Sequence, residues 1–245
     1  MATEAPLAGA VAVVTGASGN LGPVWTHALR EAGATVVGID LTAADGVEEA
    51  DVTEPEALRG ALERIAAAHG VPSVLVNNAG IDQPPDPAAG GDESPDAFRR
   101  TLEVNLVGTF NATTVFGGAM VEAGRGSIVN VGSLYASVAP EPRFYDHLPG
   151  FVKPAAYGSS KAGVVQLTRY FARRWGPHGV RVNAISPGGV RAAQDPEFLS
   201  KYCARVPLGR MAEPGDLGGP LVFLASDASR YVTGHELRVD GGFTA

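Results

Sequence analysis

The sequence predicts an α/β protein in three layers, with a doubly wound parallel sheet of about seven strands and helices on both faces. Three observations predict this class. A strand-like apolar run near the N-terminus stops at glycines and continues as a helical pattern. Strand-like and helical patterns then alternate along the 245 residues, which favours a parallel sheet buried on both faces. Right-handed crossovers turn such an alternation into a doubly wound sheet.

The elements follow one another in a regular order. Apolar runs rich in valine, isoleucine and alanine predict strands at Ala10–Val14, Thr35–Ile39, Val74–Val76, Ser127–Val131, Val180–Ile185 and Glu236–Val239. Helical patterns fill most of the intervals, at Leu21–Ala32, Pro55–His69, Pro95–Glu122, Ala156–Trp175 and Pro214–Ala225. No linker, internal repeat or low-complexity stretch divides the chain, so we expect residues 1–245 to form a single domain.

Composition excludes several classes of function. The net charge is −7, so we expect no nucleic-acid partner, because phosphate backbones bind to basic faces. The single cysteine, Cys203, has no partner for an internal disulfide and no neighbours for a metal site. The apolar N-terminal run lacks a preceding basic segment, and no stretch has the length of a membrane span. These features predict a cytoplasmic protein with neither a metal nor a membrane partner.

The turn after the first predicted strand indicates a nucleotide site. The segment Val11–Gly22 reads VAVVTGASGNLG, and Pro23 follows in the first helical turn. A strand that ends in glycines and restarts as a helix presents backbone N–H groups and partial positive charge to a phosphate. Glycine is needed because a side chain would hold the pyrophosphate away from the backbone. The cofactor contacts expected here are Gly16, Ser18, Asn20 and Leu21.

An acidic residue follows the second predicted strand. Asp40 lies about twenty residues after the glycines, where a carboxylate accepts hydrogen bonds from the adenosine ribose hydroxyls. A carboxylate there repels a 2′-phosphate, and no Lys or Arg lies beside it to reverse this, so we expect NAD rather than NADP as the cofactor. Asp51 and Val52 are candidates for bordering the adenine, although an Asp before a helix also serves as a plain turn or cap residue.

The next strand ends in Asn77-Asn78-Ala79-Gly80. Adjacent amides and a glycine at a strand end are suited to bracing loops around a cofactor, and an Asx-type turn is the alternative. Together with the motifs further along the chain, this stretch makes the sequence resemble the short-chain dehydrogenase/reductase family, which has a Rossmann-type fold. The motifs that carry the resemblance cover nearly the full length, in the family's order: TGASGNLG at Thr15–Gly22, NNAG at Asn77–Gly80, Asn105, Ser133, YGSSK at Tyr157–Lys161 and SPGG at Ser186–Gly189.

Tyr157 and Lys161 lie four residues apart in a helical pattern, so their side chains share one face. Hydride transfer at a carbinol carbon needs a group that takes or gives the hydroxyl proton, and a tyrosine of ordinary pKa, about 10, is too weak a base at neutral pH. A nearby ammonium favours the phenolate, so we expect Lys161 to lower the pKa of Tyr157. The resemblance implies that Tyr157 is the catalytic acid–base group and that Lys161 also holds the nicotinamide ribose.

Two further residues complete the expected reactive set. The Ser133 hydroxyl, just after a predicted strand, is placed to hydrogen-bond the substrate oxygen, with Ser137 as a competitor. Asn105 lies inside a long helical pattern, an unfavourable place for an amide that competes for backbone hydrogen bonds. The resemblance implies that Asn105 holds a water in a proton relay reaching Lys161.

Two segments depart from the family pattern or extend it. The interval from Ser133 to Tyr157 is longer than the family usually shows, with the extra stretch near 141–153. We expect this insertion to lie over the pocket mouth and to recognise a polar substrate, and a surface or subunit-contact loop is an equal alternative. The segment 194–206 is a candidate lid. The candidate substrate contacts are Arg143, His147 and Gln194.

The loop after the strand 180–185 resembles the one that lies beside the nicotinamide in the family. Its expected cofactor contacts are Pro187, Gly188 and Val190. The threonine usual a little downstream is missing, so carboxamide binding is expected to depend on backbone groups at Val190.

These residues predict an NAD-dependent oxidoreductase that interconverts a secondary alcohol and a ketone on a small polar substrate, such as a sugar, polyol or hydroxy acid. A reductase of a hydrophobic ketone, of the steroid or acyl-chain type, and a non-catalytic NAD-binding regulatory protein are the alternatives. Family analogy implies a homotetramer. The exact substrate, the physiological direction and the stereochemistry do not follow from the sequence.

Overall fold

The computed structural model describes residues 5–85 and 93–245. Within them, seven strands form one parallel sheet in the order β3-β2-β1-β4-β5-β6-β7. The strands are β1 (Val11–Thr15), β2 (Thr35–Asp40), β3 (Val47–Glu49), β4 (Val74–Asn77), β5 (Gly126–Val131), β6 (Val180–Pro187) and β7 (Glu236–Val239). The predicted α/β class with a doubly wound parallel sheet is confirmed.

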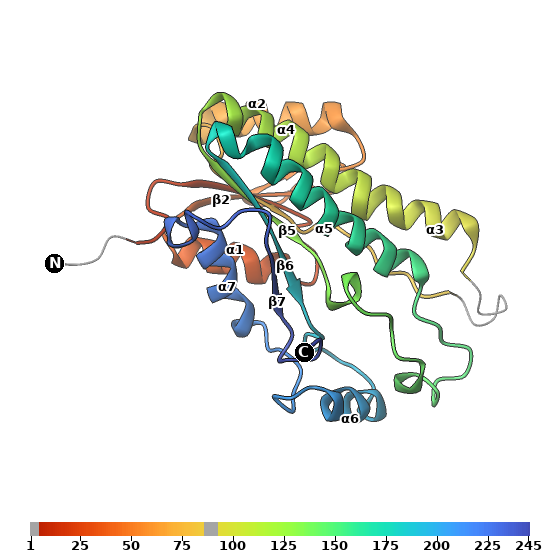
Figure 1. Ribbon diagram of the computed structural model, residues 1–245. Coiled ribbons are helices and arrows are strands. Elements are labelled where there is room, and N and C mark those ends of the chain that lie inside the picture. Colours follow the sequence, from red (N-terminus) through yellow and green to blue (C-terminus); the bar gives the residue numbers. More distant parts are fainter. Residues whose placement is uncertain (1–4, 86–92) are drawn as a thin grey trace.

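Helices cover both faces of the sheet (Figure 1). On one face lie α1 (Gly22–Glu31) and α7 (Gly215–Ala225), and on the other α2 (Pro55–His69), α4 (Gly108–Glu122) and α5 (Ala155–Trp175). Of the remaining helices, α3 (Pro95–Leu102) leads towards α4, and α6 (Pro196–Arg205) lies beyond the carboxyl ends of β6 and β7.

Each face of the sheet has its own apolar core. Trp25, Leu29 and Leu217 are fully buried on the α1 and α7 side, and Leu58 and Phe116 on the other side. Burying a large apolar side chain contributes about 1.5–3 kcal/mol, so these two cores fix the helices against the sheet. All five residues of β1 are buried, because both helical layers cover this central strand.

The winding of the chain reverses between β1 and β4. These two strands are neighbours, with β2 and β3 on one side and β5, β6 and β7 on the other. Their last residues, Thr15 and Asn77, are paired in the sheet. In doubly wound sheets such a reversal opens a crevice at the carboxyl ends of the strands, where ligands bind. The glycine turn and the Asn-Asn-Ala-Gly stretch therefore face each other across this crevice.

Three local features differ from the sequence prediction. The sequence does not predict β3, because three residues at a partly exposed sheet edge give no periodic pattern. The single helix predicted at 95–122 is interrupted by a π-helical turn at Glu103–Val107. The segment 194–206, predicted only as a lid, contains α6, whose N-terminus is capped by the Asp195 carboxylate.

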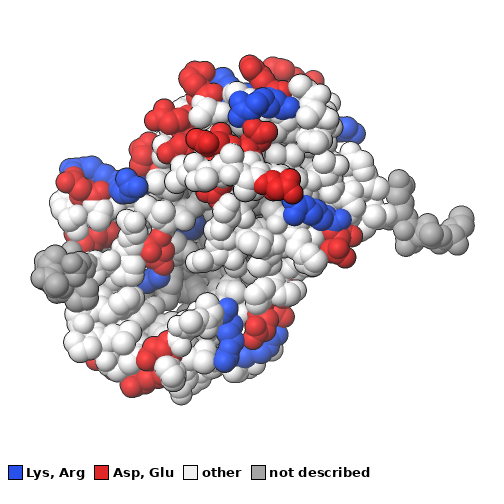
Figure 2. Space-filling view, turned by 180° about the vertical axis from the view of Figure 1, so that it is seen from behind, with Lys and Arg blue, Asp and Glu red and all other residues white. Residues whose placement is uncertain are grey.

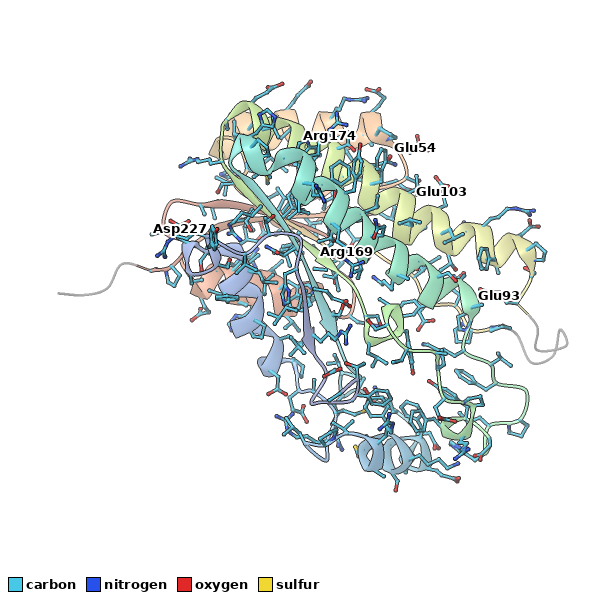
Figure 3. All side chains as sticks on the ribbon, viewed as in Figure 1. Glu54, Glu93, Glu103, Arg169, Arg174 and Asp227 are labelled. Atoms are coloured by element: carbon cyan, nitrogen blue, oxygen red, sulfur yellow. The ribbon has the colours of Figure 1, made fainter. Side chains whose placement is uncertain are left out.

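The first turn of α5 is held from outside the helix. Figure 3 shows Glu93 beside this turn, and its carboxylate accepts a hydrogen bond of 3.1 Å from the backbone N–H of Ala156. An acceptor at this position satisfies one of the unpaired N–H groups of the helix start. The contact fixes the turn on which Tyr157 lies.

Charged side chains are distributed without a basic surface on the face shown in Figure 2, where lysines and arginines lie among acidic residues. In the part of the chain that the structure describes, no helix combines the length and the hydropathy that crossing a bilayer requires.

Candidate active site

The glycine turn forms one wall of a cleft of about 620 Å³. Gly16 adopts a φ of +63°, and a Cβ atom there would lie 2.7 Å from the Cα atom of Ala79. A Cβ atom on Gly22 would lie 2.2 Å from the carbonyl oxygen of Ala17. Only glycine fits at both positions, and the turn thereby packs against the loop after β4. Gly19, Asn20 and Leu21, which lead into the N-terminus of α1, line the cleft. A glycine turn at a helix N-terminus suits a pyrophosphate.

Asn78 links the two loops of the crevice. Its side-chain amide donates to the carbonyl oxygens of Thr15 at 3.1 Å and Gly16 at 2.8 Å, and its Oδ1 accepts from the indole N–H of Trp25 at 2.8 Å. The Thr15 hydroxyl accepts from the backbone N–H groups of Asn78 and Ala79, both at 3.1 Å. These bonds are the structural basis of the bracing expected from the Asn-Asn-Ala-Gly stretch. Thr15 was not among the predicted site residues, and its only signal in the sequence is a hydroxyl at a strand end.

Asp40 lies at the end of β2 and faces the glycine turn. One carboxylate oxygen accepts from the backbone N–H of Ser18 at 2.8 Å, and the other accepts from the N–H of the next residue at 2.8 Å. Asp51 accepts from both the N–H and the hydroxyl of Thr53, at 2.8 Å each, which is the plain turn role. Asp51 and Val52 nevertheless line the cleft.

Most of the predicted cofactor contacts line this one cleft: Gly16, Ser18, Asn20, Leu21, Asp40, Asp51, Val52, Asn78, Ala79, Gly80, Tyr157 and Lys161. Arg100 lines it too and was not predicted. Of the loop after β6, Gly188 and Val190 line an adjoining cavity instead, and Pro187 ends the strand. Glycines that leave room for a pyrophosphate, a helix N-terminus and an acid at the second strand fit a dinucleotide.

Asn105 is completely buried in the π-helical turn. Its Oδ1 accepts from the N–H of Ile81 at 2.7 Å, and its Nδ2 donates to the carbonyl of Ile81 at 2.9 Å and to the Ser160 hydroxyl at 3.1 Å. The side chain therefore fastens the loop after β4 to α5. A Cβ atom on Gly80 would lie 3.2 Å from Asn105 Oδ1 and 3.6 Å from Lys161 Nζ, so these groups converge, and the water relay stays a prediction.

Tyr157, Lys161 and Ser133 come together at the carboxyl end of β5. The Lys161 ammonium is buried, donates to the carbonyl oxygen of Val131 at 2.8 Å, and lies 5.8 Å from the centre of the Tyr157 ring. The Ser133 hydroxyl accepts from the N–H of Tyr135 at 3.2 Å and lowers the pKa of the Tyr157 phenol. The three side chains that the sequence assigns to the reaction thus face one small region.

The predicted acidification of Tyr157 does not hold in this structure. Burial and, to a smaller extent, the Asp82 carboxylate raise the pKa of Tyr157 to about 12, against a lowering effect of Ser133. Burial also lowers the pKa of Lys161 to about 8, against an opposing effect of Asp82. The helical spacing reveals the shared face but not the depth of burial, and desolvation of the phenolate dominates here. The phenol is therefore protonated at neutral pH.

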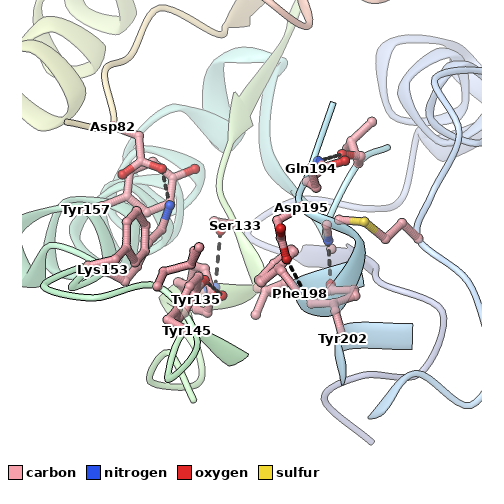
Figure 4. Close-up of a pocket in the computed structure, with 17 residues that line it drawn as sticks. Asp82, Ser133, Tyr135, Tyr145, Lys153, Tyr157, Gln194, Asp195, Phe198 and Tyr202 are labelled. Atoms are coloured by element: carbon pink, nitrogen blue, oxygen red, sulfur yellow. Dashed lines mark hydrogen bonds and ion pairs between the residues drawn. The ribbon is translucent and has the colours of Figure 1, made fainter. Parts of the chain in front are cut away.

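A second cavity, of about 450 Å³, adjoins the cleft and shares Asp82 and Tyr157 with it. Figure 4 shows Asp82 and Lys153 beside Tyr157, with Asp195 and Phe198 on the facing side. A mostly apolar pocket with a few convergent polar groups is typical of a substrate site. Most of its wall is aromatic or aliphatic: Leu134, Tyr135, Tyr145, Leu148, Phe151, Tyr157, Val190, Phe198, Tyr202 and Met211.

Asp82 and Lys153 form an ion pair in the wall of this cavity. Their side chains are 33% and 16% exposed. Neither residue was predicted, because they lie 71 positions apart in the chain and only the fold brings them together. The lysine is the last residue of the insertion predicted at 141–153, which thereby reaches the site.

The predicted substrate contacts have different positions. The Arg143 side chain is 88% exposed, pairs only loosely with an acidic neighbour, and does not line the cavity, so its position gives no support to a substrate contact. His147 shares a hydrogen bond of 2.7 Å with Asp195 and thereby joins the insertion to α6. Gln194 lines the cavity, but its amide donates to the carbonyl of Val190 at 2.8 Å within its own loop.

A charged cluster also connects the insertion to α6. Asp146, His147 and Glu197 bring potential ligand atoms within 4.8 Å of one another. The Lys201 ammonium pairs with Asp146 and with Glu197, the latter at 2.8 Å, and lies 3.4 Å from His147 Nδ1. An ammonium among these groups makes the cluster a cross-link between the two segments rather than a cation site.

The loop after β6 is fixed from α6. The N–H of Gly189 donates to the Tyr202 hydroxyl at 2.5 Å. Val190 forms a parallel bridge with Ala212. The backbone around Val190, on which carboxamide binding is expected to depend, is therefore held in one position.

Comparison with known proteins assigns the chain to a family. A family model described as Enoyl-(Acyl carrier protein) reductase matches residues 16–244. A galactitol 2-dehydrogenase (L-tagatose-forming) of Cereibacter sphaeroides is 37% identical over 97% of this chain and 96% of that protein. A (3R)-3-hydroxyacyl-CoA dehydrogenase of Mus musculus is 35% identical over 99% of each.

Solved structures agree with these sequence matches. A short chain dehydrogenase from Leptospira borgpetersenii with bound NAD+ has a TM-score of 0.88 and 33% identity, over 98% of this chain and 94% of that one. A gluconate 5-dehydrogenase from Burkholderia cenocepacia in complex with NADP and tartrate has a TM-score of 0.86 and 31% identity, over 98% and 97%.

This chain belongs to the short-chain dehydrogenase/reductase family. The resemblance stated from its motifs is confirmed, and the chain is an oxidoreductase that acts on CH–OH donors. The non-catalytic alternative is thereby set aside. Structures in the short-chain dehydrogenase/reductase family contain NAD+ in one neighbour and NADP in another, so the choice of cofactor depends on this chain's own residues.

Proposed function

We propose that this chain interconverts a secondary alcohol and a ketone on a small polar substrate, a sugar, polyol or hydroxy acid, with NAD as its cofactor. The observation that carries the proposal is the position of Tyr157, which lines both the long cleft and the smaller cavity. Ser133 lines the cavity and Lys161 the cleft. A carbinol at Tyr157 therefore lies between a substrate pocket and a cofactor cleft. The relative named as a galactitol dehydrogenase supports a polyol-like substrate.

The side chains divide the proton chemistry between them. Tyr157 exchanges a proton with the substrate oxygen, and the Ser133 hydroxyl hydrogen-bonds the same oxygen as its charge changes. NAD, when bound, supplies the hydride acceptor or donor. Because burial raises the pKa of Tyr157 to about 12, the phenol is ready to donate a proton to a ketone at neutral pH. Alcohol oxidation uses the phenolate, so its rate is expected to increase with pH.

Asp40 supports NAD over NADP. Its carboxylate is held towards the glycine turn by the Ser18 N–H, where a 2′-phosphate on the adenosine ribose would meet like charge. Fluorescence titration should therefore give tighter binding of NADH than of NADPH, and Asp40→Ser should reduce the difference. Tighter binding of NADPH by the unmodified chain would overturn this assignment.

The activity is tested by following NADH formation from NAD+ with a panel of polyols, sugars and hydroxy acids. At least one member is expected to be oxidised, and Tyr157→Phe should remove that rate. Intact NADH binding without turnover of any member of the panel would contradict the proposed function.

A reductase of a hydrophobic ketone is the second candidate. The aromatic wall formed by Tyr145, Phe151 and Phe198 favours it, as does the relative named as a hydroxyacyl-CoA dehydrogenase. Oxidation of NADH with a 3-oxoacyl thioester, compared with a polyol-derived ketose, distinguishes the two substrates.

The assembly is proposed by analogy with the family, and the location from the cysteine content and the N-terminal sequence. We expect a homotetramer, which light scattering coupled to size-exclusion chromatography would test, and a cytoplasmic location. Exposed aromatic side chains on α4 and α5, Phe110 and Tyr170, are compatible with subunit contacts along these helices.

A further inference from the structure

The ion pair of Asp82 and Lys153 lies beside the reacting group. Asp82 lines both the cavity and the cleft, and Lys153 lines the cavity. The Lys153 ammonium lies 5.1 Å from the centre of the Tyr157 ring and 5.9 Å from that of Tyr135. The pair lies beside Tyr157 (Figure 4), where the carbon next to a reacting carbinol has to be accommodated.

We propose that Asp82 and Lys153 together recognise a vicinal diol, with the hydroxyl beside the reacting carbinol donating to the Asp82 carboxylate and accepting from the Lys153 ammonium. The inference rests on the proposed function, because it specifies the substrate of that same site. It selects neutral polyols and cyclic diols from the wider class of sugars, polyols and hydroxy acids.

The chemistry of the pair matches a hydroxyl group. A carboxylate only accepts hydrogen bonds and an ammonium only donates them, whereas a hydroxyl does both. The Lys153 side chain is mostly buried, and partly desolvated charges gain most from a ligand that satisfies them. One alcohol hydroxyl contacts both members without separating opposite charges.

The charge balance of the cavity disfavours an anionic substrate. Its charged lining side chains are two acids, Asp82 and Asp195, and one base, Lys153. A substrate carboxylate at Lys153 would have to compete with the Asp82 carboxylate that already pairs with this ammonium. Arg143, the other cation of the insertion, is exposed and away from the cavity.

The remaining wall suits the carbon skeleton of such a diol. Rings of Tyr145, Phe151 and Phe198 surround the cavity, and Tyr145 stacks on the other two with ring centres 4.8 Å and 5.3 Å apart. Aromatic faces provide apolar contact for C–H groups. The cavity thus combines apolar walls with one polar pair next to Tyr157.

Four probes of similar size test the inference: cis- and trans-1,2-cyclohexanediol, cyclohexanol and cis-2-hydroxycyclohexanecarboxylate, each with NAD+. We expect kcat/KM for the better diol to exceed that for cyclohexanol by at least about tenfold, because a site built for a hydroxyl rejects the analogue that lacks it. The carboxylate should also be poorer than the diol. A diol-to-cyclohexanol ratio near one, or preference for the carboxylate, would overturn the inference.

Variants locate the effect. Asp82→Asn and Lys153→Gln should each lower the diol-to-cyclohexanol ratio by about tenfold. Glu48→Gln is the matched control, because the Glu48 side chain in β3 is also 33% exposed and is ion-paired with Arg64 of α2. This variant should leave the diol-to-cyclohexanol ratio unchanged. If the ratio survives both site variants, the pair does not recognise the diol. If one site variant fails to fold, the other gives the same test.

A pH profile separates recognition from mere support of the loop. Because the Asp82 carboxylate raises the pKa of Tyr157, Asp82→Asn should move the alkaline rise of oxidation to lower pH, and Glu48→Gln should not. If none of the probes is oxidised, the separate panel of polyols, sugars and hydroxy acids decides whether the proposed function fails. Calorimetric binding of the four compounds to the NADH complex then decides the inference by the same ratio of affinities.

Discussion

The two halves of the site are built differently. On the cofactor side, buried or half-buried side chains bond to backbone groups: Asn78 to the glycine turn, Asn105 to Ile81, and the Thr15 hydroxyl to two N–H groups of the facing loop. On the substrate side, the insertion and α6 are joined by side chains alone, through aromatic contacts and ion pairs such as that of Lys201 with Glu197.

The difference has an energetic meaning. An unsatisfied buried N–H costs about 1–3 kcal/mol, so the cofactor side tolerates few arrangements other than the observed one. Exposed ion pairs contribute about 0–1 kcal/mol at most sites, so the charged links between the insertion and α6 rearrange at little cost, and the buried rings of Phe144 and Tyr202 hold these segments more firmly. In the proposed function, the rigid half holds the nicotinamide cofactor and the adaptable half holds the substrate. The predictions below test this division, from the largest expected effect to the smallest.

Tyr157 is the point where the two halves meet, and its hydroxyl should matter more than any bond within either half. Tyr157→Phe keeps the ring and removes only the acid–base group. We expect kcat to fall by about 10³-fold, within the range typical for loss of a general acid or base, with an unchanged circular dichroism spectrum. A loss below about tenfold would show that another group moves the proton.

Removing one hydroxyl from each half compares them directly. Thr15→Val conserves shape but leaves two N–H groups of the β4 loop without their acceptor, so urea unfolding should show a loss of about 2 kcal/mol or more. Tyr145→Phe removes the hydroxyl bonded to that of Tyr135 at 3.2 Å, and the loss should stay below about 1 kcal/mol. Equal losses would mean that the substrate half is as rigid as the cofactor half.

The same division explains what the sequence reveals. Tyr157 and Lys161 are one helical turn apart, and Asp40 stands at a fixed distance from the glycines, so local spacing predicts them. The pair Asp82 and Lys153 is assembled from distant segments, and no local pattern indicates it. The sequence shows that Asn105 lies at an unfavourable position inside a helical pattern. It does not predict the π-helical turn that accommodates this residue.

Burial is the other property that spacing does not convey. Burial of Tyr157 raises its pKa, whereas the sequence predicts a lowered value. Arg143 is exposed to solvent and does not enter the cavity, which its spacing in the sequence does not reveal. Polarity of the insertion therefore predicts that this segment reaches the site, while the residue that does so, Lys153, is identified only by the fold.

Burial of the Lys161 ammonium in the rigid half reduces the stability of the fold. Burial lowers its pKa from 10.5 to about 8. Below pH 8 the lysine is charged in both states, and the buried charge of the folded state has the higher free energy because it is desolvated. Lys161→Met should raise the free energy of unfolding at pH 7 by about 1–2 kcal/mol, because the desolvation penalty outweighs the loss of the bond to Val131. Activity should be lost in the same variant.

The pH dependence of this gain has a definite sign. Between pH 8 and 10.5 the unfolded state binds more protons at Lys161 than the folded state does. The destabilisation caused by Lys161 therefore decreases, and the free energy of unfolding of the wild type increases, as the pH rises. The advantage of Lys161→Met, measured by urea unfolding of both proteins, should therefore shrink across this window and be constant below it. A gain that grows with pH would contradict a lowered pKa.

Lys201 should give the smallest effect, and for that reason it tests the adaptable half most sharply. Its ion pairs with Asp146 and Glu197 are largely exposed, so Lys201→Met should leave the thermal midpoint unchanged, as should the control Arg99→Met, which removes an exposed pair with Asp96 on α3. Only Lys201→Met should raise KM for the substrate, because it removes ion pairs between the insertion and α6. The increase should be only about twofold, because the hydrogen bond between His147 and Asp195 still joins these segments. A clear drop in the thermal midpoint for Lys201→Met alone would break the comparison, because side-chain links would then hold the substrate half as firmly as backbone bonds hold the cofactor half.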